Sequence, residues 1–91
     1  MTTADRVREQ LREENPEALF CDGYDTAIVG VGRRCAQPPL VVYSVQKYID
    51  ALVAGGMTEG EAHEFFEFNV AGAWMGPHTP LFLYLADDAG A

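Results

Sequence analysis

The stretch of residues 44–61 restricts the possible folds more than any other, because it contains the signals for a helix start, a helix end and a second helix start. Ser44 is a favourable N-cap residue, and apolar residues recur on one helical face after it. Gly55 and Gly56 are typical of a helix end. Thr58 and Glu61 have the spacing of a capping box, which opens a second helix. The stretch therefore predicts a helical hairpin.

Strand patterns lie on both sides of this hairpin. Residues 26–31 (TAIVGV) and 40–44 (LVVYS) have the β-rich composition of strands, with the loop GRRCAQPP between them, and a third strand begins at Pro80 (TPLFLYLA). Two helices return the chain to the end of the sheet that it left, so we expect the third strand to run antiparallel to the second. The prediction is an α+β domain with an N-terminal helix, a β-hairpin, the helical hairpin and a third strand. The helices are expected to pack on a three-stranded, mostly antiparallel sheet.

The N-terminal segment predicts a weak helix over residues 4–14, ended by Asn15 and Pro16. The helix is marginal because its apolar stripe has only three members, Ala4, Val7 and Leu11. Whether it packs on the sheet is left open by the sequence.

The chain has the size of a single small domain. At 91 residues and 48% hydrophobic content it is too apolar for a disordered chain, although its core is thin. We expect three parts, namely the weak helix in residues 1–16, the core in 18–85 and a frayed tail in 86–91.

The charge balance excludes some classes of partner. Fourteen acidic residues against six basic ones give a formal net charge of −8, which argues against direct binding to nucleic acid or to an anionic membrane. A basic protein partner remains compatible. The polar start shows no signal peptide and no run approaches a membrane span, so a cytoplasmic location is expected. Cys21 and Cys35 are then expected to be free thiols, with a disulfide across the hairpin as the alternative.

Two glycines behind an apolar run, Gly30 and Gly32, suggest a phosphate-binding loop at first sight. Such a loop lies between a strand and a helix, whereas here a proline-bearing loop and another strand follow, and the third glycine of the fingerprint is missing. We therefore expect a bulge or a close packing contact instead. Arg33 and Arg34 then lie in a solvated hairpin loop.

Neither a metal site nor an active site is predicted. His63, His78, Cys21 and Cys35 have a metal-compatible composition but no close ligand pair. No nucleophile and base stand in a recognisable arrangement, so we expect no catalytic residue, no cofactor and no enzyme activity.

Three acids repeat along the second helix at Glu61, Glu64 and Glu67. Paired carboxylates act in acid–base catalysis only in a cleft that shifts their pKa values. On an amphipathic helix they are most simply a solvated face.

Asn69 fills one place in the apolar stripe of the second helix, whose other members are Ala62, Phe65, Phe66, Val70 and Ala73. A buried asparagine must be hydrogen-bonded, and we favour an internal bond that fixes the packing. The alternative is a polar group presented in an apolar pocket or interface.

Apolar residues occur on both faces of the predicted strands, yet one helical hairpin covers only one face. The other face needs a cover, because monomers seldom expose large apolar patches. The N-terminal helix, a second copy in a homodimer, and a partner protein are the three possibilities. The residues expected at such an interface are Tyr43, Phe68, Trp74, Phe82 and Tyr84.

The motifs DGYDTAIVG, VVY, EFFEFNVAGAWMG and TPLF occur in this order. In this pattern the chain resembles a family of short proteins of tailed phages, prophages and other mobile elements, over roughly residues 18–83. The resemblance implies a phage or mobile-element origin and a bacterial cytoplasm. It carries no activity and no catalytic residue over to this chain.

Two functions follow as hypotheses. The first is a small, acidic, non-enzymatic interaction protein that binds and modulates, by inhibition, a host or phage protein such as a host-defence component. The second is a binder of a small molecule or signalling nucleotide, acting as a sponge, as a monomer or a homo-oligomer. Its expected polar groups are Tyr24, Asp25, Arg33, Arg34, Asn69 and His78.

Overall fold

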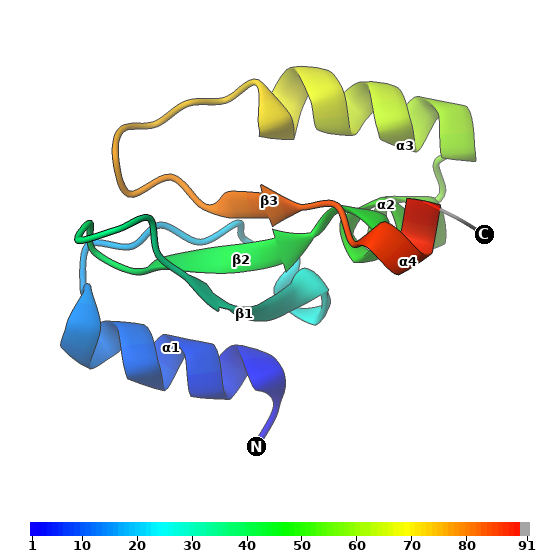
Figure 1. The fold of residues 1–91 in the computed structure, drawn as a ribbon. Coiled ribbons are helices and arrows are strands. Elements are labelled where there is room, and N and C mark those ends of the chain that lie inside the picture. The colour runs from blue at the N-terminus through cyan, green and yellow to red at the C-terminus, as the bar shows by residue number, and fades with distance from the viewer. Residues whose placement is uncertain (90–91) are drawn as a thin grey trace.

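The computed structural model describes residues 1–89, which form one α+β fold (Figure 1). Three strands form one sheet, and helices precede, interrupt and follow it. The helices are α1 (Thr3–Glu14), α2 (Val45–Ala54), α3 (Glu59–Phe66) and α4 (Ala86–Ala89), with a 3₁₀ turn η1 (Asp25–Ala27) and a π-helical turn η2 (Glu67–Ala71). The strands are β1 (Ile28–Gly32), β2 (Leu40–Ser44) and β3 (Leu81–Leu83). The α+β class and the order of elements are confirmed.

The sheet is mixed, with the strand order β1-β2-β3. β1 and β2 form the predicted antiparallel hairpin, but β3 runs parallel to β2, so the expected antiparallel third strand is wrong. The reason lies in the path after β2. The short α2 stays near the end of β2, while α3 and the loop after it carry the chain back to the opposite end of the sheet (Figure 1).

The local signals for the helical hairpin are confirmed. The Ser44 side chain accepts a hydrogen bond from the Lys47 N–H at 3.2 Å and caps α2. Gly55 is the C-cap of α2, and Gly56 follows with a φ of 114°, which glycine adopts without strain. Thr58 and Glu61 make both bonds of the capping box of α3.

The end of the second helix differs from the prediction. The Gly72 N–H donates to the Glu67 carbonyl at 3.2 Å, five residues back, so the helix widens into a π turn and ends by Gly72. Within this turn Val70 packs against the core, whereas Asn69 points away from it. Asn69 and Ala73 are therefore exposed, and the expected burial of Asn69 is wrong.

The core lies on one face of the sheet, which we call the inner face and define by Ile28, Val41 and Tyr43. These residues pair across the ladders, so they share a side, and each is at most 2% exposed. α1 buries its whole predicted stripe in the same core, together with apolar residues of α2 and α3. The N-terminal helix therefore packs on the sheet.

In the expected tail, residues 86–89 form α4, and residues 90–91 lie outside the described residues.

A buried asparagine does fix the packing, but it is Asn15 rather than Asn69. Asn15 is 5% exposed, and its amide nitrogen donates to the Pro39 carbonyl at 2.9 Å and lies 3.1 Å from His78 Nδ1. Its side-chain oxygen accepts from the Glu17 N–H at 3.3 Å. One side chain thus joins the end of α1, the hairpin loop and the loop before β3.

Asn15→Ala should lower the free energy of unfolding by about 2–3 kcal/mol, because three hydrogen bonds are lost and the buried Pro39 carbonyl keeps no donor. Urea denaturation followed by circular dichroism measures the change. Asn69→Ala removes an exposed amide and is the matched control, with an expected change within about 0.5 kcal/mol. Equal effects of the two substitutions would contradict this role for Asn15.

Candidate functional site

The opposite face of the sheet, which we call the outer face, consists of Gly30, Gly32, Val42, Leu81 and Leu83. Gly30 pairs with Val42 and Val42 with Leu81, so these side chains point the same way. A hollow of about 570 Å³ lies over these residues. Leu81 and Leu83 remain 41% and 42% exposed. The outer face is therefore apolar and open.

The two glycines shape this face. The β1–β2 register shifts between Ile28 and Gly30, which is a β-bulge, and no atom lies within 4 Å of a Cβ built on Gly30. A Cβ on Gly32 would come 2.8 Å from Val42 Cγ2 and 3.1 Å from Leu81 Cδ1. The predicted bulge and the predicted close contact are both confirmed. Without side chains at these two positions, the sheet surface is hollowed rather than ridged.

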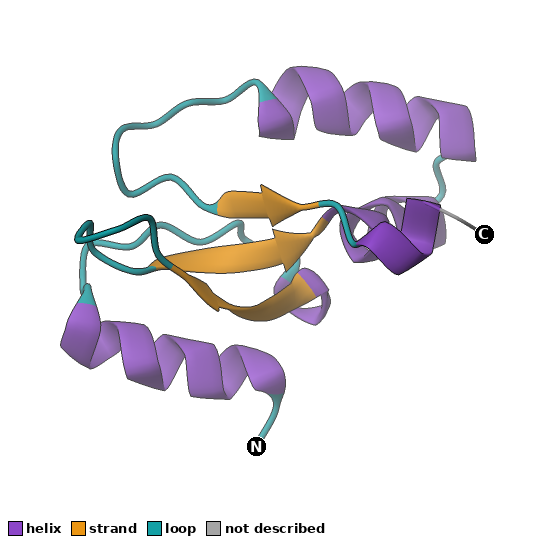
Figure 2. Ribbon diagram, in the orientation of Figure 1, coloured by secondary structure: helices purple, strands orange, loops and turns teal. Residues whose placement is uncertain are grey.

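No helix among residues 1–89 covers the outer face. α1, one of the three expected covers, buries Val7 and Leu11 in the same core as Ile28 and Tyr43, and no residue of α1 lines the hollow. Figure 2 shows the strands between α1 on the β1 side and α3 on the β3 side. A second copy or a partner protein remains as a possible cover.

The residues expected at an interface divide into exposed and buried ones. Phe68, Trp74 and Tyr84 are 79%, 76% and 67% exposed. Tyr43, in contrast, is fully buried on the inner face, where its hydroxyl accepts from the Cys21 N–H at 2.7 Å. Phe82 is partly buried because it lies next to Tyr43 in the ladder, with their ring centroids 5.9 Å apart. Tyr43 is therefore a core residue and the prediction for it is wrong, whereas the half-buried Phe82 also lines the hollow over the outer face.

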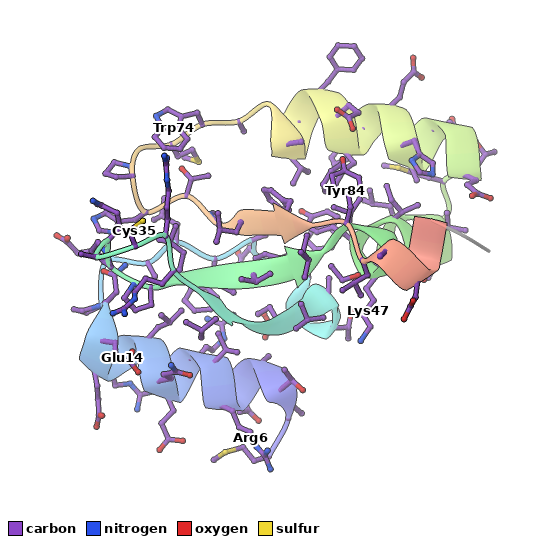
Figure 3. The ribbon with its side chains drawn as sticks, viewed as in Figure 1. Arg6, Glu14, Cys35, Lys47, Trp74 and Tyr84 are labelled. Atoms are coloured by element: carbon purple, nitrogen blue, oxygen red, sulfur yellow. The ribbon has the colours of Figure 1, made fainter. Side chains whose placement is uncertain are left out.

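The three exposed aromatic residues do not form one cluster. Phe68 lies on the helical side beside Met57 and Glu64. The Tyr84 hydroxyl donates to Glu67 Oε1 at 3.4 Å, and Trp74 lies in the loop before β3 (Figure 3). The apolar surface is better described by the segment 74–85, which supplies six of the ten exposed large hydrophobic residues among those described. These six are Trp74, Met75, Leu81, Leu83, Tyr84 and Leu85.

Three of the expected ligand-binding residues lie apart from one another. Tyr24 stacks on Tyr48 with a centroid distance of 4.2 Å, and Asp25 pairs with Arg8 at 2.7 Å. Asn69 lies on the helical hairpin, beside Glu61 and Phe65. These positions do not share a pocket.

Of the other three expected ligand-binding residues, two line the same second hollow. Arg34 and His78 line a groove of about 400 Å³ between the hairpin loop and the loop before β3, and Trp74 lines it too. Arg33 borders the outer face instead. The two arginines therefore do not converge on one ligand site.

The charge distribution is uneven along the chain. Lys47 is the last lysine or arginine in the sequence. The sequence after Lys47 contains seven acidic side chains and no lysine or arginine. The seven acidic residues are Asp50, Glu59, Glu61, Glu64, Glu67, Asp87 and Asp88. The half of the chain that contains β3 and the exposed segment 74–85 is thus uniformly acidic.

The side chains that could hold a metal or act as nucleophiles are scattered over the described part of the chain. Among the side chains of residues 1–87, no three from His, Cys, Asp or Glu are close enough to hold a metal ion. Cys21 and Cys35 are free thiols, and burial raises the pKa of the Cys21 thiol, which disfavours the reactive thiolate. The absence of enzyme activity stays a prediction.

A scan against protein-family models and searches among curated proteins and solved structures give no match. The described residues also contain no helix of the length and apolarity that a membrane crossing requires.

The tyrosines beneath the sheet give the fold a pH dependence. Burial raises the pKa of Tyr43 to about 12 and raises the pKa of Tyr48 as well. Because the folded pKa lies above the usual value of about 10, the neutral hydroxyls stabilise the fold fully below pH 10. This stabilisation is lost as the pH rises from about 10 through 12.

Tyr43→Phe should weaken this pH dependence, because it removes one of the two ionisable groups. We expect the drop in urea midpoint between pH 9 and pH 11.5 to be smaller than in the wild type. Tyr84→Phe, which removes an exposed hydroxyl, should leave most of the drop in place. An unchanged drop in Tyr43→Phe would show that Tyr43 does not titrate with unfolding.

Proposed function

We propose that this chain is a non-enzymatic protein-binding module, and that a partner protein binds to its outer face. The observation that carries the proposal is the open apolar hollow over Gly30, Val42 and Leu81. Contiguous apolar surface of this kind marks interaction sites in small proteins. The exposed segment 74–85 extends it beyond β3.

The partner should be a protein with basic residues around an apolar centre. A net charge of −8 attracts a basic surface over long range and repels an acidic one. A second copy of the chain would bring two charges of −8 together. Charge therefore favours a different protein over a homodimer as the occupant of the outer face.

The biological setting of the proposal comes from the resemblance to phage and prophage proteins. As part of the proposal, this resemblance implies a bacterial cytoplasm and a host or phage protein as the partner. A chain with a binding face and no catalytic arrangement would act by covering a surface of that partner. Inhibition, for example of a host-defence component, is then the expected consequence.

Gly30→Leu tests the proposal, because it fills the hollow and no atom lies within 4 Å of the new Cβ. We expect the thermal unfolding midpoint to stay within a few degrees. Affinity capture from a bacterial lysate should retain a basic protein on the wild type. Capture by Gly30→Leu should fall at least tenfold.

Gly60→Leu is the matched control, because it adds the same side chain to open space on α3. It should capture the same partner as the wild type, and this capture should weaken in 0.5 M salt. Equal capture by both variants would contradict the proposal. A wild-type dimer that Gly30→Leu converts into a monomer would identify a second copy as the occupant instead.

A further inference from the structure

The groove beside Trp74 has the construction of a small-molecule site and adjoins the hollow on the outer face, with which it shares Leu81 and Phe82. Its volume of about 400 Å³ is in the range of ligand pockets. Prolines and aliphatic side chains form most of its wall, and a few polar groups interrupt them. The polar groups are Arg34, Gln37, His78 and Thr79.

The loop that forms one wall is held in place although it has no regular secondary structure. Thr79 Oγ1 accepts from the Met75 N–H at 2.8 Å and donates to the Gly76 carbonyl at 2.7 Å. The Leu19 N–H donates to the His78 carbonyl at 3.1 Å. This wall is therefore largely pre-formed, which lowers the entropic cost of binding.

The histidine of the groove is also fixed. Asn15 uses one amide N–H for Pro39, and its other N–H points to His78 Nδ1. His78 Nδ1 is then the acceptor, and Nε2–H donates to Glu17 Oε2 at 3.2 Å. Both ring nitrogens have partners within the protein. His78 therefore forms part of the wall and leaves no ring nitrogen free for a ligand.

Two side chains remain available to a ligand. The Trp74 indole is 76% exposed and has no ring partner among the described residues. Arg34 is exposed and makes no ion pair with the side chains of residues 1–87. An indole face stacks on a planar ring, and a guanidinium binds one carboxylate or phosphate.

We propose that this groove binds a small planar ring that carries a single anionic group, the chemistry of a nucleoside monophosphate or an aromatic carboxylate. Trp74 stacks on the ring and Arg34 pairs with the anion. Because Arg33 faces the other hollow, the site has one cation, which suits one anionic group rather than a polyphosphate. Trp74 and Arg34 do not line the outer-face hollow, so this site does not rest on the function proposed there.

The single tryptophan of the chain is itself the probe, because it lies in the groove. Its fluorescence, excited at 295 nm, is titrated with AMP, benzoate, adenosine and inorganic phosphate. We expect AMP or benzoate to change the emission and to bind at least tenfold more tightly than adenosine or phosphate. The ligand that binds more tightly, AMP or benzoate, shows whether the groove prefers a nucleoside monophosphate or an aromatic carboxylate.

Arg34→Gln should weaken that binding at least tenfold, whereas Arg33→Gln, at the neighbouring position, should change it less than twofold. The proposal is overturned by the absence of a fluorescence change up to 10 mM with every probe. It is also overturned if adenosine binds as tightly as AMP and benzoate as weakly as phosphate, or if both arginine variants weaken binding equally.

Discussion

The fold depends on one constraint, which is that its buried apolar core is built on one face of the sheet. Val41 and Tyr43 on the inner face are fully buried, and α1, α2 and α3 all contribute to the same core. Asn15 holds this arrangement together because it bonds to the hairpin loop and to the loop before β3. The outer face receives none of this cover. Its exposure is thus a consequence of how the inner face is built.

The two surfaces with proposed roles are the hollow on the outer face and the groove at Trp74. Both are formed by parts of the strands and loops that the core does not cover. The bulge near Gly30 and the contact of Gly32 with Val42 give a hollow on the outer face. The long return to a parallel β3 passes over the hairpin loop and forms the groove at Trp74. One surface suits a protein and the other a small ligand, since the first is broad and apolar and the second contains Arg34.

Features that depend on a few neighbouring residues were predictable from the sequence. The caps at Ser44 and Thr58 and the glycine bulge each rest on local conformational preferences. The π turn that exposes Asn69 and the parallel direction of β3 depend on packing between distant segments, so local patterns gave the wrong result. The pattern of apolar residues also did not predict that Asn15, at the end of a helix, is the buried asparagine. The sequence correctly predicted that Phe68, Trp74 and Tyr84 are exposed aromatic residues. It did not predict that they lie apart from one another on the surface.

The most direct test of this account measures solvent access to the methyl groups of the free protein at low concentration. A soluble paramagnetic gadolinium chelate broadens NMR signals of exposed methyl groups and leaves buried ones sharp. The account predicts strong broadening for Leu81 and Leu83 and weak broadening for Val41 and Leu11. Protection of Leu81 and Leu83 to the level of Val41 would mean that the outer face is already covered in the free protein, which would contradict the central claim.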